Sequence, residues 1–181
     1  CSPEIMLTRS REILIKVQSK PCSIMQKLNG KTITKTNSIL CRSIGEIIAN
    51  YHLISTSYNY KIKNDRDLQW VDKSIEKVKN HITKEQLKAL LYSRKIFKRL
   101  FEIDLPHGII HSDLFRDNVL AEKNKIRGII DYYYSFNGPF IYELGVIIND
   151  WCVNKDGSIN KNKFNSFIKS YNSVRKLSSL E

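Results

Sequence analysis

Apolar side chains recur every three or four residues along most of this chain of 181 residues, a spacing that predicts amphipathic helices. The first expected helix runs from Ser38 to about Ser55, and a second follows it closely. Thr83 to Gln86 is a capping-box pattern that starts a third, and two more are expected at 141–153 and around 164–174. The expected buried positions are, in chain order, Leu40, Ile44, Ile47, Ile48, Tyr51, Leu68, Val71, Ile75, Val78, Ile82, Leu87, Leu90, Leu91, Phe97, Leu100, Leu144, Ile147, Ile148, Trp151, Phe164, Phe167, Ile168, Tyr171 and Val174.

Shorter apolar runs predict strands near the start of the chain. Residues 13–17 and 22–25 form two such runs, and the polar turn 18–21 joins them. A polar connection at 26–31 then leads toward the first helix. The beginning of the chain is therefore expected to form a small sheet.

A second group of strands is expected between the third and fourth helices. Gly108 to Ile110 reads as a buried strand, and two apolar runs at 119–120 and 126–130 flank a polar turn, which is typical of a hairpin. Residues 135–139 contain Asn-Gly-Pro and are expected to form a turn. A few strands, then mostly helices, with a hairpin between them, indicate an α+β fold.

The composition narrows the functional classes. Hydrophobic residues make up 41% of the chain, enough for a real core, and no run of about eighteen apolar residues exists, so no membrane span is expected. The four cysteines, Cys1, Cys22, Cys41 and Cys152, are widely spaced and form no C-x-x-C pair, which argues against a zinc site and fits the reducing cytoplasm. No pattern points to a particular oligomeric state.

The formal net charge of +12 raises the question of nucleic-acid binding. The lysines are spread among Ile and Asn residues, as at 61–64 and 160–163, and no arginine-aromatic interleaving suggests a base-stacking surface. We therefore expect no nucleic-acid partner, and interpret the charge as a solvated surface.

The stretch from His111 to Asn118 carries the most specific chemistry. It has the pattern H-x-D-x-x-x-x-N, and the apolar strand that follows it ends at Asp131. Kinase-like folds use these groups to transfer a phosphoryl group from ATP to a hydroxyl. Asp113 is expected to take the proton of the acceptor hydroxyl, while Asn118 and Asp131 hold Mg²⁺, a hard ion that prefers oxygen ligands. His111 is expected to bond backbone rather than transfer protons. The alternative is that Asp113 and Asn118 merely form turns.

Four segments resemble one known family. Residues 109–120, I-I-H-S-D-L-F-R-D-N-V-L, resemble the catalytic loop of the aminoglycoside phosphotransferase and choline kinase superfamily. I-D-Y-Y-Y-S-F-N at 130–137, N-D-W-C-V at 149–153 and N-D-R-D-L-Q-W at 64–70 resemble segments of its homoserine kinases. The resemblance implies a protein-kinase-like α+β fold of the aminoglycoside phosphotransferase type, with a partial small sheet lobe and a mainly helical C-terminal lobe that carries the catalytic hairpin.

The resemblance also implies a division of the chain. Residues 1–30 would be the remnant of the N-terminal sheet lobe and the hinge, and residues 31–181 the helical lobe with the catalytic and metal-binding loops. Met25, Gln26 and Lys27 would contact the adenine of ATP, because they lie at the hinge position. Neither a Gly-rich phosphate loop nor the phosphate-binding lysine precedes that hinge, so the sequence is expected to be a fragment that binds ATP weakly by itself and whose activity alone is open.

The acceptor implied by the resemblance is L-homoserine, whose phosphorylation serves threonine biosynthesis in the cytoplasm. Arg116 is expected to bind its carboxylate, although a salt bridge to Asp117 or to another carboxylate is an equal alternative. Glu143 stands where relatives carry an Asp that braces the catalytic loop, and His52 is expected to be structural. The remaining residues expected on the acceptor side are Tyr132, Tyr134, Asn137 and Asp150.

Two other functional classes remain open from the residues alone. One is a kinase of the same fold that acts on choline, an aminoglycoside or a sugar, and the tyrosine run at 132–134 would suit part of a choline cage. The other is a non-catalytic basic binding module, which predicts salt-sensitive affinity and indifference to substitution of Asp113.

Overall fold

The computed structural model describes residues 2–181, so Cys1 and any inference on its thiol lie outside it. The helices are α1 (Ser38–Ser55), α2 (Leu68–Val78), α3 (Lys84–Glu102), α4 (Phe140–Trp151) and α5 (Lys161–Val174). The strands are β1 (Ile5–Met6), β2 (Ile15–Val17), β3 (Lys20–Cys22), β4 (Ile24–Met25), β5 (Lys31–Thr32), β6 (His107–Ile110), β7 (Val119–Glu122), β8 (Lys125–Ile129) and β9 (Phe136–Pro139). The predicted α+β class is confirmed.

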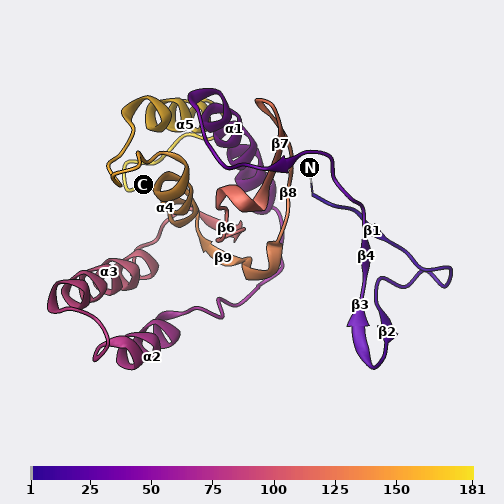
Figure 1. Ribbon diagram of the computed structural model, residues 1–181, viewed down its shortest axis with the longest axis horizontal. Coiled ribbons are helices and arrows are strands. Elements are labelled where there is room, and N and C mark those ends of the chain that lie inside the picture. The colour runs from indigo at the N-terminus through magenta and orange to yellow at the C-terminus, as the bar shows by residue number, and fades with distance from the viewer. Residues whose placement is uncertain (1) are drawn as a thin grey trace.

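The hydrophobic core lies between α1, α4, α5 and the strands that carry the catalytic loop (Figure 1). Helices α1 and α5 pack closely, because Gly45 lets the backbone of α5 approach: a Cβ there would meet the carbonyl oxygen of Phe167 at 2.6 Å. The centre of this core consists of residues predicted from the helical spacing, among them Leu40, Ile44, Ile48, Leu144, Ile147, Trp151, Phe167 and Tyr171.

Two antiparallel sheets shape the catalytic region. Strands β5, β7 and β8 form one of them, and β7 and β8 are the predicted hairpin, with Val119 opposite Ile129. Strands β6 and β9 form the other, with Ile110 opposite Phe136. The turn expected at 135–139 is therefore wrong: long-range pairing with β6 extends this segment, and the Asn-Gly-Pro sequence ends the strand instead of reversing it.

The N-terminal strands also differ from expectation. Residues 13–25 form three strands, β2, β3 and β4, instead of two strands joined by a turn at 18–21. The expected turn residues Lys20 and Pro21 belong to β3, which pairs with β2. Strand β4 pairs with β1, so Met25 lies opposite Ile5. This part of the chain projects from the helical body (Figure 1).

Helices α2 and α3 form a hairpin beside the core (Figure 1). The capping box at Thr83 is present, with Gln86 bonding back to the Thr83 backbone. The expected burial of α3 is wrong, since no residue of this helix is buried and Leu91 remains 50% exposed. Besides α2, α3 contacts the body of the fold through Phe97 and Phe101, whose rings lie near Tyr142 and Phe136. Ile82 lies beyond the end of α2.

Candidate active site

The loop after β6 is held from behind by a buried carboxylate. Glu143, on α4, accepts hydrogen bonds at Oε1 from the backbone N–H groups of His111 (2.7 Å) and Ser112 (2.9 Å). Ser112 has φ 64°, in the left-handed region, and its hydroxyl donates to the carbonyl of Tyr134 at 2.5 Å. The loop is thus fixed at the point where the chain turns toward Asp113, and Glu143 braces it from the position where relatives carry an Asp.

His111 joins the two loops of the site. Its Nε2 lies 2.9 Å from the carbonyl oxygen of Ile130, which can only accept, so Nε2 carries the proton. Its Nδ1 then accepts the backbone N–H of Asp113 at 3.3 Å. This neutral histidine bonds backbone on both sides, which confirms the structural role expected for it.

Asn118 contacts both loops of the site. Its side-chain amide donates to the carbonyl oxygen of Asp113 at 2.7 Å and to the Asp113 carboxylate at 3.2 Å. Its own carbonyl accepts the backbone N–H of Ile130 at 2.9 Å. Because the amide nitrogen faces Asp113, the amide oxygen points the opposite way, and no hydrogen bond within residues 2–181 uses it.

Asp131 directly follows Ile130 and turns the chain out of β8. Its backbone has φ 65° and ψ 59°, the left-handed conformation that Asp and Asn tolerate better than other non-glycine residues. The side chain is exposed and takes part in no ion pair of the described chain. Asn118 and Asp131 therefore supply an amide and a carboxylate oxygen from two backbone segments joined at Ile130, and oxygen donors of this kind suit a hard divalent cation.

Residues 2–181 contain no cluster of three or more His, Cys, Asp or Glu side chains that would enclose a metal ion. A cation at Asn118 and Asp131 would therefore have few protein ligands. Mg²⁺ is usually bound in this way, with substrate phosphates and water completing its shell. The residues present fit such an ion.

A buried polar chain extends from Glu143 to the far side of the fold. The Oε2 atom of Glu143 lies 2.6 Å from Nε2 of His52, and Nδ1 of His52 lies 2.8 Å from the hydroxyl of Tyr171. Arg175 donates to the same hydroxyl at 3.0 Å and pairs with Glu181. Burial raises the pKa of Tyr171, so it remains a neutral phenol. His52 is structural, as expected.

Arg116 and Asp150, both expected on the acceptor side, bind each other. The Nε atom of Arg116 lies 3.0 Å from both carboxylate oxygens, its Nη2 lies 2.9 Å from Oδ1, and its backbone N–H donates to Oδ2 at 2.8 Å. The salt-bridge alternative is the arrangement found, with Asp150 of α4 as the partner. Contact of either residue with an acceptor stays a prediction.

Two further expected acceptor residues also have structural partners. The Tyr132 ring packs 4.7 Å from the His111 ring, and burial, aided by the charge of Glu143, raises the pKa of Tyr132 to about 12. Asn137 accepts the backbone N–H of Ile62 at 2.6 Å and donates its own N–H to the Ile62 carbonyl at 3.0 Å. Asn137 therefore attaches the chain segment before α2 to β9.

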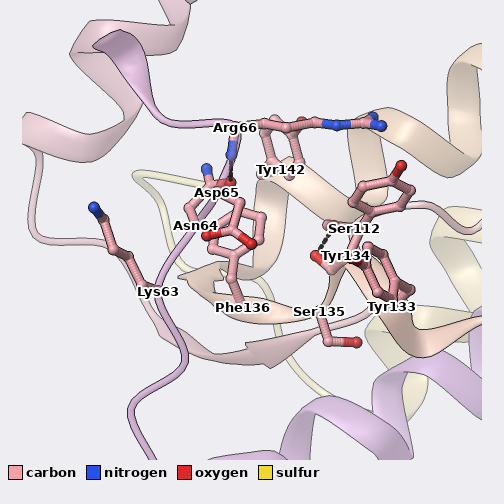
Figure 2. A pocket seen from close by; sticks show the side chains of 10 residues that line it. All are labelled: Lys63, Asn64, Asp65, Arg66, Ser112, Tyr133, Tyr134, Ser135, Phe136 and Tyr142. Carbon is pink, nitrogen blue, oxygen red and sulfur yellow. Dashed lines mark hydrogen bonds between the residues drawn. The ribbon is translucent and has the colours of Figure 1, made fainter. Parts of the chain in front are cut away.

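Tyr134 borders a small pocket, with a cavity volume of about 40 Å³, beside the catalytic loop (Figure 2). The guanidinium of Arg66 lies 3.7 Å from the centre of the Tyr134 ring. Burial raises the pKa of Tyr142; the negative charge of Asp113 adds to the shift and the positive charge of Arg66 opposes it, so both charges act on this pocket. The lining residues are Lys63, Asn64, Asp65, Arg66, Ser112, Tyr133, Tyr134, Ser135, Phe136 and Tyr142.

Sequence reasoning missed Arg66, Ser112 and Tyr142 as pocket residues. Arg66 and Ser112 had a signal, because they belong to the N-D-R-D-L-Q-W segment at 64–70 and to the catalytic-loop segment at 109–120, whereas Tyr142 had none. The position of Arg66 against Tyr134 depends on contacts between distant parts of the chain.

The residues expected at the adenine lie on the projecting N-terminal part. Met25 and Lys27 are exposed, and the backbone N–H of Gln26 donates to the carbonyl of Glu4 at 2.8 Å. Their contact with a nucleotide stays a prediction. No helix in the described residues is long and apolar enough to cross a membrane.

Comparison with known proteins points to one family. A model of the phosphotransferase enzyme family matches residues 6–177. A homoserine kinase of Polaromonas naphthalenivorans is 31% identical over 184 residues, which cover 99% of this chain and 58% of that protein. One of Methylobacillus flagellatus is also 31% identical, over 99% of this chain and 56% of the relative. The chain thus spans little more than half the length of these curated relatives.

A solved structure shows the same fold at much lower identity. An amicoumacin kinase in complex with AMP-PNP and Ca²⁺ superposes with a TM-score of 0.73 at 15% identity, over 98% of this chain and 57% of that one. This similarity confirms the kinase-like fold of the aminoglycoside phosphotransferase type.

Proposed function

Because this chain belongs to the phosphotransferase enzyme family, we propose that it is the catalytic part of an ATP-dependent kinase that phosphorylates an alcohol. The observation that supports this most is the placement of Asp113, Asn118 and Asp131 on two loops joined by His111. Phosphoryl transfer needs a proton acceptor beside oxygen ligands for a cation, and this arrangement supplies both.

Asp113 is the proposed proton acceptor. The acceptor oxygen forms a bond to the γ-phosphorus of ATP while the bond from that phosphorus to the bridging oxygen of ADP breaks, and the hydroxyl proton passes to the Asp113 carboxylate. Asn118 orients that carboxylate by its 3.2 Å hydrogen bond, and His111 fixes the backbone. Such preorganisation avoids the cost of orienting the base during the reaction.

Asn118 and Asp131 are the proposed ligands of Mg²⁺. When bound, this ion would neutralise charge on the phosphates. Met25, Gln26 and Lys27 are the proposed adenine contacts, in the part of the chain that we interpret as the edge of the N-terminal lobe and the hinge.

We propose L-homoserine as the acceptor, because the curated relatives at 31% identity are homoserine kinases. Choline, an aminoglycoside or a sugar is the second candidate, favoured only by the fold shared with the amicoumacin kinase. The homoserine relatives match 99% of the chain at twice the identity of that structure, which is why homoserine comes first.

The test is ADP release by the intact protein that contains these residues, with homoserine, choline, sugars and aminoglycosides as acceptors. Homoserine-dependent release that falls at least about 1,000-fold in Asp113→Asn, with Mg-ATP binding retained, would support both the reaction and the base. A protein that binds Mg-ATP and releases ADP only with another acceptor would overturn the homoserine assignment. An active Asp113→Asn variant would overturn the role of the base.

A further inference from the structure

The pocket at Tyr134 lies between two segments that are far apart in the sequence. One wall is the chain at 63–66, before α2, and the other is the chain at 133–136, before and within β9. Ser112 contributes to the lining and is the direct neighbour of Asp113 in the catalytic loop. A group bound in this pocket would therefore contact the residue that precedes the proposed base, although Asp113 itself does not line the pocket.

Arg66 is the cation that reaches across this pocket (Figure 2). Its guanidinium stacks on Tyr134, an arrangement that leaves the edge of the guanidinium and its N–H donors available. No carboxylate of residues 2–181 forms an ion pair with it. The only hydrogen bond recorded for this residue in the described chain is made by its backbone, to the side chain of Asn64 at 2.8 Å.

Arg116, the residue expected from the sequence to bind the acceptor carboxylate, already has an ion-pair partner. Its Nε and Nη2 atoms already bind the Asp150 carboxylate, and its Nη1 lies 3.3 Å from the carbonyl of Thr34. Binding an acceptor there would require giving up a bidentate ion pair. Arg66 has no ion pair among residues 2–181 to give up.

We propose that Arg66 binds the carboxylate of the acceptor and so selects an amino acid as substrate. This inference rests on the proposed function, because it assigns the anion-binding group of the same site. Tyr134 holds the guanidinium plane by stacking, and the carboxylate accepts its N–H donors while the hydroxyl end of the acceptor reaches Asp113. A bidentate guanidinium–carboxylate pair also fixes orientation, which a reaction at one end of a short molecule requires.

The same arrangement excludes cationic acceptors. A quaternary ammonium such as choline would need the open faces of aromatic rings, but the guanidinium of Arg66 already covers the face of Tyr134. The positive charge of Arg66 would also repel the ammonium groups of an aminoglycoside. Arg66 therefore distinguishes the proposed acceptor from both rivals.

The experiment compares three acceptors in the intact protein. L-homoserine carries both charged groups, 3-amino-1-propanol lacks the carboxylate, and 4-hydroxybutyrate lacks the ammonium. Steady-state kinetics would give kcat and KM, and calorimetric titration with Mg-AMP-PNP present would give the affinity of each. Arg66→Met should weaken the binding of homoserine and of 4-hydroxybutyrate by about 30-fold and leave the KM for ATP unchanged. It should also remove the preference of the wild type for homoserine over 3-amino-1-propanol.

Two variants serve as controls. Arg66→Lys keeps the charge but loses the fork, so we expect an intermediate affinity for homoserine. Lys61→Met removes one positive charge from the same exposed segment outside the pocket, and homoserine affinity should stay within about two-fold. Arg66 is exposed, so its replacement should leave the thermal unfolding temperature unchanged.

The outcomes separate this inference from the proposed function. ADP release with homoserine by the wild type, with the same KM and the same acceptor preference in Arg66→Met, would retain the function and overturn the role of Arg66. A wild type inactive on homoserine would overturn the acceptor, and binding of 4-hydroxybutyrate that is lost in Arg66→Met would still support the carboxylate site. Absence of 4-hydroxybutyrate and homoserine binding in the wild type would overturn it.

Discussion

The Nε2 atom of His52 lies 2.6 Å from the Oε2 atom of Glu143 in the fully buried centre of the fold. The other oxygen of that carboxylate accepts two backbone N–H groups of the catalytic loop. Both oxygens are therefore satisfied, as buried carboxylates require. One side chain connects α1 to the loop that carries Asp113.

Removal of this carboxylate should damage both stability and activity. Glu143→Ala would leave two loop N–H groups and His52 without their acceptor, so we expect a loss of about 3 kcal/mol in the free energy of unfolding and a lower kcat. Denaturant unfolding and kinetics would measure them. Glu122→Ala, which removes a surface partner of Arg127, is the control and should cost less than about 1 kcal/mol. Equal losses in the two variants would contradict the brace.

Asp131 combines a left-handed backbone with a proposed metal-binding side chain, and two substitutions separate these. Asp131→Asn keeps the tolerance for φ 65° and should unfold within about 0.5 kcal/mol of the wild type, yet require about tenfold more Mg²⁺ for half-maximal activity. Asp131→Ala should lose the metal equally and cost about 1 kcal/mol in addition. A magnesium titration unchanged in both variants would rule out the metal role.

Replacing two helical glycines by alanine should change stability in opposite directions, because Gly45 lies at the close contact of α1 with α5 and Gly145 faces open space. In Gly45→Ala the new methyl would meet the Phe167 carbonyl oxygen at 2.6 Å, and we expect a loss of about 1–3 kcal/mol in unfolding free energy. In Gly145→Ala on α4 nothing lies within 4 Å, so the higher helix propensity of alanine should stabilise the protein by about 0.5 kcal/mol or more. Thermal unfolding of the pair would decide; a destabilised Gly145→Ala would refute the open space.

Tyr132 predicts how stability changes in alkaline solution. Its pKa rises from 10.0 to about 12 in the folded protein, so the folded state holds the phenol proton more tightly than the unfolded state. The resulting stabilisation is complete below pH 10 and is lost as the pH rises toward about 12. Tyr132→Phe should show a smaller decline in unfolding free energy across this window. If the unfolding free energies of the two proteins fell in parallel with pH, the raised pKa of Tyr132 would be contradicted.

The sequence predicted the elements whose signals are local. The bounds of α1 agree with the prediction, because its apolar stripe is continuous and Asn37 caps its start by accepting two backbone N–H groups. The catalytic hairpin was likewise marked by two apolar runs around a polar turn. The loop motif itself indicated the family, which the comparison confirms, and predicted the roles of Asp113 and Asn118. The role of Asp131 likewise stays a prediction.

What the sequence left undetermined depends on contacts between distant residues. The apolar stripe of α3 shows that one face is hydrophobic, but periodicity does not tell whether anything covers it, and Leu91 stays exposed. The extension of β9 depends on β6, nearly thirty residues earlier. The partners of Arg116 and Arg66 likewise emerge only when α4 and the segment before α2 are placed beside the loop.

The paired hydrogen bonds between Asn137 and Ile62 have a consequence for how such an enzyme would acquire a new substrate. They attach the segment that carries Arg66 to β9, and β9 is itself paired with β6, the strand that precedes Asp113. The proposed selecting residue, Arg66, and the proposed base, Asp113, are thus both positioned by the β6–β9 pair, although they come from separate stretches of sequence. A change of acceptor then requires new side chains at 63–66 while the reaction machinery is inherited intact.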